Sequence, residues 1–366
     1  MKIIVLGTRG IPNIPGGVET HCEELYPVLA NDFKHEITVI GRSCYVGDKA
    51  GNHFRGVRLK NIYAPKSKAL EAIVHSALAV LYAAVKRPDL VHVHAVGPNL
   101  VTPLARLLGL KVVMTHHGPD YERKKWGRMA KLFLKAGEQA GVKYSNEVVV
   151  ISEEIRKSIA KKYDRKDAVL IPNGVSIKGR PVFRQEILER YGLQQYQYVF
   201  TLGRFVPEKG FDYLITAFME SGLSDRFRLV IAGDADHPSA YSDALKKQAA
   251  SAGVLLPGFI KGAALAQLFS NCALFILPSF YEGLPIALLE AMAYQLPIIA
   301  SDIPANTQVN LDPDHYFPVG NARALAEKLV QFAGNGNIGK PAVYNMAAYD
   351  WKNIAQKTDE VYNRMV

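Results

Sequence analysis

The chain has few cysteines and no uninterrupted apolar segment long enough to span a membrane clearly. Its three cysteines are widely separated and form no C-x-x-C pair, so a reducing compartment is the simpler inference. The most apolar stretch, residues 69–85, is slightly short for a membrane span and contains Glu71 and His75, so we expect a buried or interfacial helix. Zinc-finger spacing and a basic-aromatic RNA-binding signature are also missing, which disfavours nucleic acid as a ligand.

The bulk composition is that of a globular protein with a large core. The chain has 366 residues, of which 49% are hydrophobic and 21% charged, and this length suits two domains. Residues 2–6 are too short an apolar run for a signal peptide and end in a glycine turn, so we expect a first buried strand. The net charge of +10 attracts polyanions such as nucleic acid, anionic lipid or phosphorylated substrates.

Strand and helix patterns alternate along both halves of the chain. The expected strands are 2–6, 36–40, 90–94, 111–115, 147–151, 198–202, 228–232, 273–277 and 297–300. The expected helices include 19–30, 71–86, 211–220, 239–251, 264–270 and 285–293. Alternation of this kind predicts an α/β protein of two doubly wound domains, divided near 174–183 and facing a cleft, with ligands at the carboxyl ends of the strands.

The most informative stretch, residues 279–292, is expected to form a strand-end turn followed by a helix. Glu282 and Glu290 are eight positions apart, and helical rise would separate them by roughly 12 Å. Backbone N–H groups at the helix start, near Gly283 and Leu284, favour an anion. A nucleoside diphosphate sugar fits this pattern, with its sugar near Glu282 and its ribose near Glu290.

Two further loops carry phosphate-binding character. In residues 7–19 a glycine-rich loop opens a helix, and Gly16 and Gly17 allow backbone to approach a phosphate closely. The loop lacks G-x-G-x-x-G, which disfavours a dinucleotide site. In residues 203–212, Arg204 and Lys209 flank a proline-containing turn, so both can point into one cleft and neutralise a diphosphate in place of a metal ion.

Histidines follow the expected strand 111–115. His116 and His117 are adjacent on an extended chain and should point in opposite directions, and no third metal ligand is evident. Asp120 is a candidate for orienting an acceptor, and residue types alone leave an inverting general-base mechanism open. His92 and His94 lie on one face of a strand, where a structural role is expected.

A D-x-D sequence, Asp234 and Asp236, follows another expected strand. Two carboxylates alone are weak evidence for metal ligands, so we interpret this segment as a loop near the nucleotide. No metal ion and no organic cofactor are expected.

A basic segment, residues 123–135, is expected to form an amphipathic helix. Helical spacing places Lys124, Arg128, Lys131 and Lys135 on one face. Apolar bulk comes from Trp126, Met129, Phe133 and Leu134. Such a helix suits a membrane surface or a lipid diphosphate, while the alternative is a solvated helix that packs on its own core.

These motifs together resemble glycosyltransferase family 4, whose members are retaining enzymes with the GT-B fold. Glu282 and Glu290 resemble its E-x7-E motif, and residues 203–210 resemble its GR-x-x-x-x-KG pattern. Residues 115–118 are similar to its T-x-H-G, and 172–175 to its PNG-V turn. The opening GTRGIP…GGVE resembles a bacterial polysaccharide or O-antigen subgroup. The resemblance covers nearly the whole chain.

The resemblance implies an acceptor-binding domain of residues 1–178 with a returning helix at 349–366, and a donor-binding domain of residues 179–348. It also implies that His117 and Glu282 contact the sugar, while Arg204 and Lys209 neutralise the leaving diphosphate. Backbone at Gly258, Phe259 and Ile260 would contact the base, which fits uracil and hence a UDP-sugar.

The implied protein is a cytoplasmic enzyme, peripheral on the inner face of the plasma membrane. It would transfer a hexose or N-acetylhexosamine to a polyprenyl-diphosphate-linked glycan for surface polysaccharide or O-antigen synthesis. Two alternatives remain: a UDP-sugar 2-epimerase on the same scaffold, and a non-catalytic sugar-nucleotide-binding subunit. A phosphorylase would need a pyridoxal lysine, which the sequence does not identify.

Overall fold

The protein is described here by a computed structural model that covers residues 1–46, 51–65, 71–122, 127–176, 181–235 and 238–365. The chain divides into two compact units. Unit 1 comprises residues 1–174 and 347–366, and unit 2 comprises residues 175–346. Lys124, Trp126 and Asp236, which the sequence singles out, lie outside the described residues.

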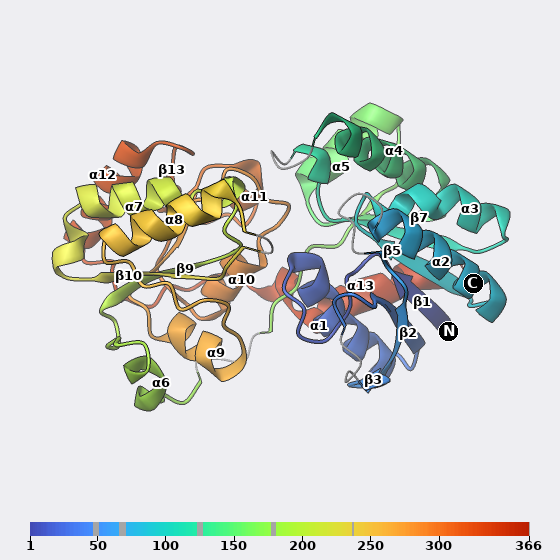
Figure 1. The fold of residues 1–366 in the computed structure, drawn as a ribbon, viewed down its shortest axis with the longest axis horizontal. Coiled ribbons are helices and arrows are strands. Elements are labelled where there is room, and N and C mark those ends of the chain that lie inside the picture. The colour runs from blue at the N-terminus through green and yellow to red at the C-terminus, as the bar shows by residue number, and fades with distance from the viewer. Residues whose placement is uncertain (47–50, 66–70, 123–126, 177–180, 236–237, 366) are drawn as a thin grey trace. The chain divides into compact units, whose positions relative to one another are not determined.

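Unit 1 is built on an eight-stranded sheet with the order β3-β4-β2-β1-β5-β6-β7-β8 (Figure 1). Only β3 pairs in the antiparallel sense, with β4. The strands are β1 (Lys2–Leu6), β2 (Glu36–Arg42), β3 (His53–Phe54), β4 (Val57–Ile62), β5 (Leu90–His94), β6 (Val112–His116), β7 (Glu147–Val150) and β8 (Val169–Leu170). Because the main strands are parallel, their carboxyl ends meet at one edge.

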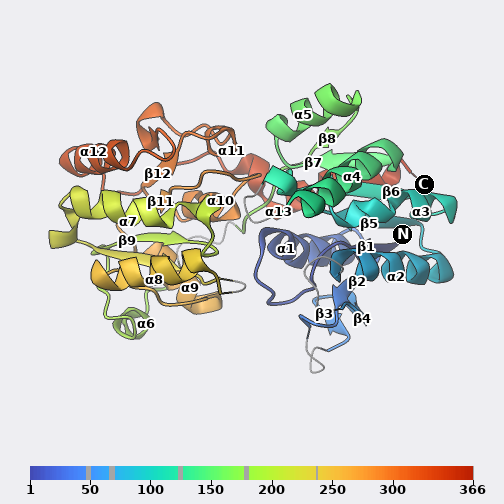
Figure 2. The ribbon, with the colours of Figure 1, turned by 45° about the horizontal axis from the view of Figure 1, so that its top comes forward.

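Helices cover both faces of this sheet, as Figures 1 and 2 show. They are α1 (Gly17–Asn31), α2 (Glu71–Lys86), α3 (Thr102–Leu107), α4 (Arg128–Tyr144), α5 (Glu153–Tyr163) and α13 (Trp351–Asn363), with short turns η1 (Pro98–Val101), η2 (Asp120–Glu122) and η6 (Ala347–Tyr349). In β1, Ile3 and Val5 pack toward α1 and α13. Ile4 and Leu6 pack toward α2 and α3. Burial on both faces explains why residues 3–6 of β1 form an unbroken apolar run.

The C-terminal helix α13 belongs to unit 1, although unit 2 precedes it in the chain. Its buried residues Trp351, Ile354 and Tyr362 share a core with α1 and β1. A Cβ atom at Gly174 would lie 2.5 Å from the Trp351 ring, so the chain passes this indole closely. The expected return of the C-terminal helix is therefore confirmed.

Unit 2 is built on a five-stranded parallel sheet with the order β10-β9-β11-β12-β13. The strands are β9 (Tyr198–Leu202), β10 (Arg228–Ala232), β11 (Leu274–Leu277), β12 (Ile298–Ser301) and β13 (Tyr316–Phe317). The helices and turns are α6 (Gln185–Glu189), η3 (Pro207–Lys209), α7 (Phe211–Glu220), η4 (Leu223–Asp225), α8 (Ala240–Ser251), α9 (Gly262–Ser270), α10 (Ile286–Ala293), α11 (Pro304–Thr307), η5 (Pro313–His315) and α12 (Ala322–Gly334). Helices α7, α8 and α12 share one core with the sheet. On the other strand face, Phe200 packs edge-on against Phe269 of α9, with ring centroids 5.1 Å apart.

Each strand expected from the apolar runs is present, and its ends differ from the expectation by no more than two residues. The strands β3, β4, β8 and β13 were not expected. None of the helices in the described part of the chain combines the length and the hydropathy of a membrane span.

Several histidines lie in the interior of unit 1, which is unusual for a group that titrates near neutral pH. His21, His75 and His92 are buried. Burial lowers the pKa of His21 and of His75 to about 4, and that of His92 to about 3. Loss of water disfavours the charged imidazolium, so these rings are neutral at pH 7.

We expect unit 1 to lose stability as the pH falls from about 6.5 toward 4. In the unfolded chain these histidines bind protons below their ordinary pKa of about 6.5, whereas in the folded chain they stay neutral down to a lower pH. Their full contribution to the free energy of unfolding is therefore present above about pH 6.5 and is lost as the pH falls. Each buried histidine contributes a slope of about 1.4 kcal/mol per pH unit within its window. Urea unfolding at a series of pH values, followed by far-UV circular dichroism, measures this slope.

His75→Gln should reduce the slope by about 1.4 kcal/mol per pH unit, the contribution of one proton, because glutamine does not titrate. His53→Gln, which changes an exposed histidine, serves as the control and should leave the slope unchanged. A free energy of unfolding that stays constant between pH 7 and 5 would contradict the neutral state of the buried rings.

Candidate active site

Two glycine loops of unit 2 come together at the carboxyl ends of β9 and β10. The Gly203 N–H donates to the Ala232 carbonyl at 3.0 Å, and the Gly233 N–H donates to the Gly258 carbonyl at 2.8 Å. Gly233 has φ of 126°, and a Cβ atom there would lie 1.9 Å from the Gly203 oxygen. Only glycine permits this approach, which brings the loop of Arg204 beside Gly233 and links Gly233 to Gly258.

Lys209 and Glu282 form an ion pair in this unit. Lys209 ends η3 after β9, and Glu282 lies in the loop after β11; Nζ and Oε1 are 2.5 Å apart. The Ser279 hydroxyl donates to the same carboxylate oxygen at 2.6 Å. The two charged side chains are 18% and 12% exposed, so water screens the pair weakly. The structure thus brings together two residues that were predicted from separate motifs.

Helix α10 begins at Ile286, with Pro285 as its N-cap residue. Glu282 therefore precedes the helix, and only Glu290 lies within it. The expected helix is present to within one residue, but its rise does not measure the distance between the two carboxylates. Before the helix, the Gly283 carbonyl accepts from Gln308 Nε2 at 3.3 Å. The sequence did not predict this role of Gln308.

The segment expected to face a base is partly open to solvent. Gly258 has φ of 76°, and Phe259 is 51% exposed. Lys261 Nζ lies 5.3 Å from the centroid of the Phe259 ring, within range of a cation–π contact. Ile260 is half-buried. An exposed aromatic ring on a glycine turn can stack on a planar ligand.

Asp234 is engaged with a lysine. Its Oδ1 lies 2.7 Å from Lys246 Nζ, and this hydrogen bond lowers the pKa of the carboxyl group. Its Oδ1 also accepts from the Ala235 N–H at 2.8 Å. This arrangement is that of a loop anchor, in agreement with the interpretation of the segment as a loop.

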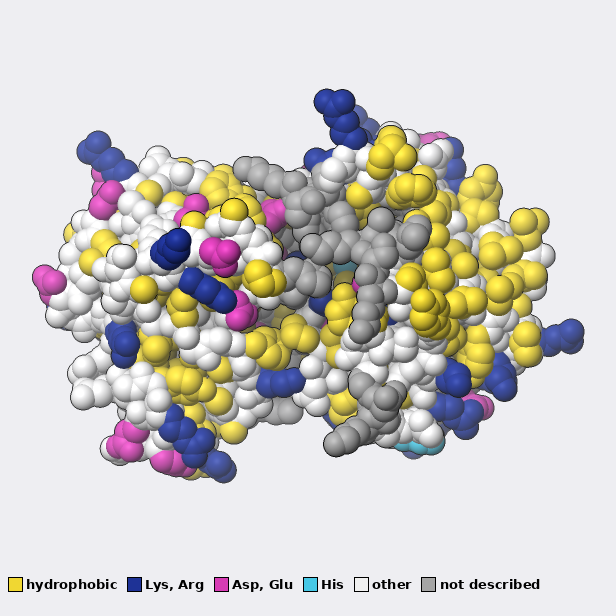
Figure 3. Space-filling model, viewed as in Figure 1, with side chains coloured by type: hydrophobic (Ala, Val, Ile, Leu, Met, Phe, Trp, Pro, Cys, Tyr) yellow, Lys and Arg dark blue, Asp and Glu magenta, His cyan; other side chains and the backbone are white. Residues whose placement is uncertain are grey.

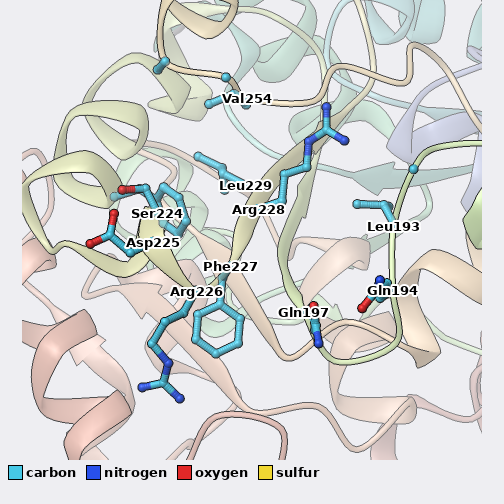
Figure 4. A pocket seen from close by; sticks show the side chains of 14 residues that line it. Leu193, Gln194, Gln197, Ser224, Asp225, Arg226, Phe227, Arg228, Leu229 and Val254 are labelled. Carbon is cyan, nitrogen blue, oxygen red and sulfur yellow. The ribbon is translucent and has the colours of Figure 1, made fainter.

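A pocket of about 500 Å³ lies elsewhere in unit 2 (Figure 4). Gln197, Arg228 and Leu229 line it, so it opens at the amino ends of β9 and β10. Ligands of doubly wound sheets bind at the carboxyl ends of strands. The pocket contains none of the predicted site residues, and we assign it no role in the site.

The glycine-rich loop of unit 1 folds onto the start of α1. The buried Glu19 carboxylate accepts from the Arg9 N–H at 3.0 Å and pairs with Arg9 Nε at 3.3 Å. A Cβ atom at Gly16 would lie 2.0 Å from Glu19 Oε2, whereas Gly17 faces open space. Gly16 therefore makes room for an internal ion pair, and Gly17 leaves the helix start accessible. Glu19 was not predicted to act as an anchor.

His117 follows β6 and turns away from its neighbour, as expected. His116 Nε2 lies 2.8 Å from Glu138 Oε1, while His117 Nε2 lies 2.9 Å from His94 Nδ1. The rings of His92 and His94 stack with centroids 4.3 Å apart, which confirms their common face. Asp120 begins η2, and its backbone N–H donates to the Gly118 carbonyl.

The basic segment forms helix α4 from Arg128 onward. Arg128 and Lys135 are exposed, and Lys131 is half-buried. Met129 and Phe133 are 67% and 48% exposed. These two apolar side chains thus remain largely uncovered, whereas Gly137, Ala140 and Val142 further along α4 are buried.

Two family descriptions match this chain, one in each half. Residues 15–178 match "Glycosyltransferase Family 4", and residues 183–351 match "Glycosyl transferases group 1". Together the two matches cover nearly all of the chain.

Curated relatives share about a quarter to a third of the aligned residues. An uncharacterized glycosyltransferase of Methanocaldococcus jannaschii is 24% identical over 99% of this chain and 98% of its own length. The Escherichia coli UDP-Gal:alpha-D-GlcNAc-diphosphoundecaprenol alpha-1,3-galactosyltransferase is 31% identical over 63% of this chain and 62% of its own length. The chain spans less than two thirds of the length of several curated relatives.

Solved structures with the same fold match the whole chain. Sucrose-phosphate synthase from Thermosynechococcus elongatus has a TM-score of 0.82 at 20% identity, and the match covers 100% of this chain and 98% of that one. The Anabaena protein HepE, in complex with UDP and glucose, has a TM-score of 0.79 at 17% identity and full coverage of both chains. The expected GT-B fold of two parallel α/β domains is confirmed. With both halves matched in order, this chain belongs to glycosyltransferase family 4.

Proposed function

We propose that this enzyme is a retaining glycosyltransferase that moves a hexose or N-acetylhexosamine from a UDP-sugar to a lipid-diphosphate-linked sugar. The observation that carries the proposal is the weakly screened ion pair between Lys209 and Glu282. An ammonium group suits a diphosphate, and a carboxylate beside it suits sugar hydroxyls. A sugar and a diphosphate are joined directly in a nucleotide sugar, so neighbouring groups of this kind fit it.

The remaining donor contacts follow from the loops of unit 2. Arg204 adds a second cation for the diphosphate, and the N-terminus of α10 adds its dipole. Glu290 binds the ribose, and the backbone of Gly258, Phe259 and Ile260 contacts the base. The solved HepE complexes hold UDP, which supports a UDP-sugar as donor.

In the reaction the acceptor hydroxyl attacks the anomeric carbon on the face that the diphosphate leaves. The bond from that carbon to the phosphate oxygen breaks, and the leaving phosphate accepts the hydroxyl proton. His117 orients the sugar and Asp120 the acceptor. The cations replace a divalent metal at the diphosphate, because they offset the charge that develops on the leaving oxygen.

The acceptor proposal draws on the Escherichia coli relative, whose name specifies a diphosphoundecaprenol-linked substrate. Surface polysaccharide or O-antigen synthesis is the pathway class that uses such lipids. An epimerase would act on the sugar nucleotide without an acceptor, and a binding subunit would bind the sugar nucleotide without turning it over. The donor assay below separates both alternatives from the transferase.

The expected result is release of UDP from one UDP-sugar only when a lipid-diphosphate sugar acceptor is present. UDP-, GDP-, ADP- and dTDP-sugars are compared without added magnesium or manganese, and released nucleotide is measured. A strict requirement for either ion would remove the proposal that Arg204 and Lys209 replace a metal. Release without acceptor would favour an epimerase or hydrolase, and nucleotide binding without turnover would favour the binding subunit.

Glu282→Ala should lower kcat by about 100-fold or more, because a hydrogen bond from a charged group contributes about 1.5–3 kcal/mol each and Glu282 is proposed to make more than one. UDP affinity should stay the same or rise, since Lys209 loses a competing carboxylate. Isothermal calorimetry with UDP and steady-state kinetics give the two values. Glu220→Ala, an exposed glutamate at the end of α7, is the matched control. Equal loss of turnover and UDP binding would place Glu282 at the nucleotide rather than at the sugar.

We also propose that unit 1 docks on an anionic membrane surface through α2, α3 and α4. Helix α3 packs against both α2 and α4. Large apolar side chains are exposed on all three helices, and Figure 3 shows hydrophobic side chains gathered over the region of α2 and α3. They are Leu78, Leu81 and Val85 on α2, Leu104, Leu107 and Leu108 on or beside α3, and Met129, Leu132 and Phe133 on α4.

Charge on these helices complements an anionic surface. The acidic residues of α2 and α4 are occupied, since Glu71 pairs with Arg42 and Glu138 is buried. The exposed charges of α4 are therefore basic. Apolar bulk with a basic rim is typical of helices that lie in a membrane interface.

Changing Arg128, Lys131 and Lys135 together to Gln should weaken binding to phosphatidylglycerol vesicles by roughly 100-fold, since each basic residue near the surface contributes about 1 kcal/mol. Vesicle co-sedimentation measures this change. The control changes Lys247, Lys352 and Lys357, which are exposed elsewhere, to Gln. Equal binding of the two triple variants would refute the assignment to α4, and equal binding to phosphatidylcholine vesicles would refute the charge argument.

A further inference from the structure

Three histidines converge in unit 1 from separate elements. His21 lies on α1, His94 ends β5, and His117 follows β6. Each histidine offers one ring nitrogen, and these three nitrogens all lie within 4.8 Å of one another. Among the described residues, this is the group of three or more side chains that could hold a metal ion. His21 and His94 are buried, while His117 is half-buried.

We propose that His21, His94 and His117 form a binding site for a divalent transition-metal ion, zinc above all. The site has three protein ligands and one position left for water or an anion, which is the coordination of open zinc sites. It belongs to unit 1, whereas the lysine and glutamate that carry the donor proposal belong to unit 2.

The partners of the outer ring nitrogens support this assignment. His21 Nδ1 lies 3.1 Å from Asn173 Oδ1, which orients the ring and leaves Nε2 for a ligand. His94 Nε2 is hydrogen-bonded to the Tyr26 hydroxyl, which leaves Nδ1. Metal-binding histidines are held in this way, with the second nitrogen on an oxygen that fixes the tautomer.

The spacing of the ligand atoms is compatible with a metal. His94 Nδ1 and His117 Nε2 are 2.9 Å apart and share a hydrogen bond. Zinc–nitrogen bonds of about 2.0–2.1 Å in a tetrahedron place the nitrogens about 3.3 Å apart. This value lies between the observed 2.9 Å and the 4.8 Å limit of the group, so the spacing of the nitrogens is close to that of a shared metal ion.

The chemistry of the group selects the kind of ion. Imidazole nitrogen suits zinc, copper and nickel, whereas magnesium and calcium require oxygen ligands that this set lacks.

The test measures zinc in the full-length chain, expressed without a polyhistidine tag. We expect about one zinc per chain after gel filtration, by elemental analysis, and tight zinc binding by the stripped protein in competition with a chromophoric chelator. Cobalt substitution should give the visible absorption of a tetrahedral site. Asn173→Ala removes the hydrogen-bond partner of His21 and should weaken zinc binding by roughly 10–100-fold. Zinc affinity should fall further when a ligand itself is changed, in His21→Asn, His94→Asn and His117→Asn.

The control is His53→Asn, which removes an exposed histidine and should retain wild-type zinc affinity. The inference fails if the folded wild-type chain binds no zinc tighter than about 1 μM, or if His53→Asn weakens zinc as much as the ligand variants do. Circular dichroism of each variant separates ligand loss from unfolding. UDP binding to the same preparations is measured separately. A chain that binds UDP but no zinc would contradict only the zinc proposal, and a chain that binds zinc but no UDP would contradict only the donor proposal.

Discussion

Parallel pairing of the strands is the constraint on which both candidate regions depend. Because neighbouring parallel strands end at the same edge, residues far apart in sequence meet there once their strands pair, as β9 does with β11 and β5 with β6. In unit 2 this edge gathers Arg204, Lys209 and Glu282. In unit 1 it gathers His94 and His117. The glycine at 233 tightens this edge, since no side chain fits between it and the neighbouring strand end.

The ion pair between Lys209 and Glu282 shows how such an edge can prepare a site. Two partly buried opposite charges satisfy each other, whereas loss of one partner leaves the other poorly solvated and typically costs 3–5 kcal/mol. A diphosphate can replace the carboxylate as partner of the lysine, and sugar hydroxyls can then satisfy the carboxylate. In the proposed function both charges would stay compensated with and without ligand, so that little reorganisation would be needed when the donor binds.

The sequence predicted the long elements and the loop motifs better than the contacts. Strands such as Leu274–Leu277 are buried on both faces and form apolar runs that are easy to recognise. The two-residue strands β3 and β13 carry too little pattern to be found. Arg204, Lys209 and Glu282 stood out because charges beside glycine and proline mark loops. Asn173 and Tyr26 did not, because their partners come from other parts of the chain.

The histidines illustrate why this limit is physical. His21, His94 and His117 are separated by long stretches of sequence, and only the order of strands β1, β5 and β6 and the packing of α1 bring them together. The burial of His21 and His94 has two consequences with one cause. Loss of water keeps the rings neutral, which makes unit 1 sensitive to acid and leaves nitrogen lone pairs available to a cation. The burial that suits the proposed metal site therefore also makes unit 1 less stable in acid.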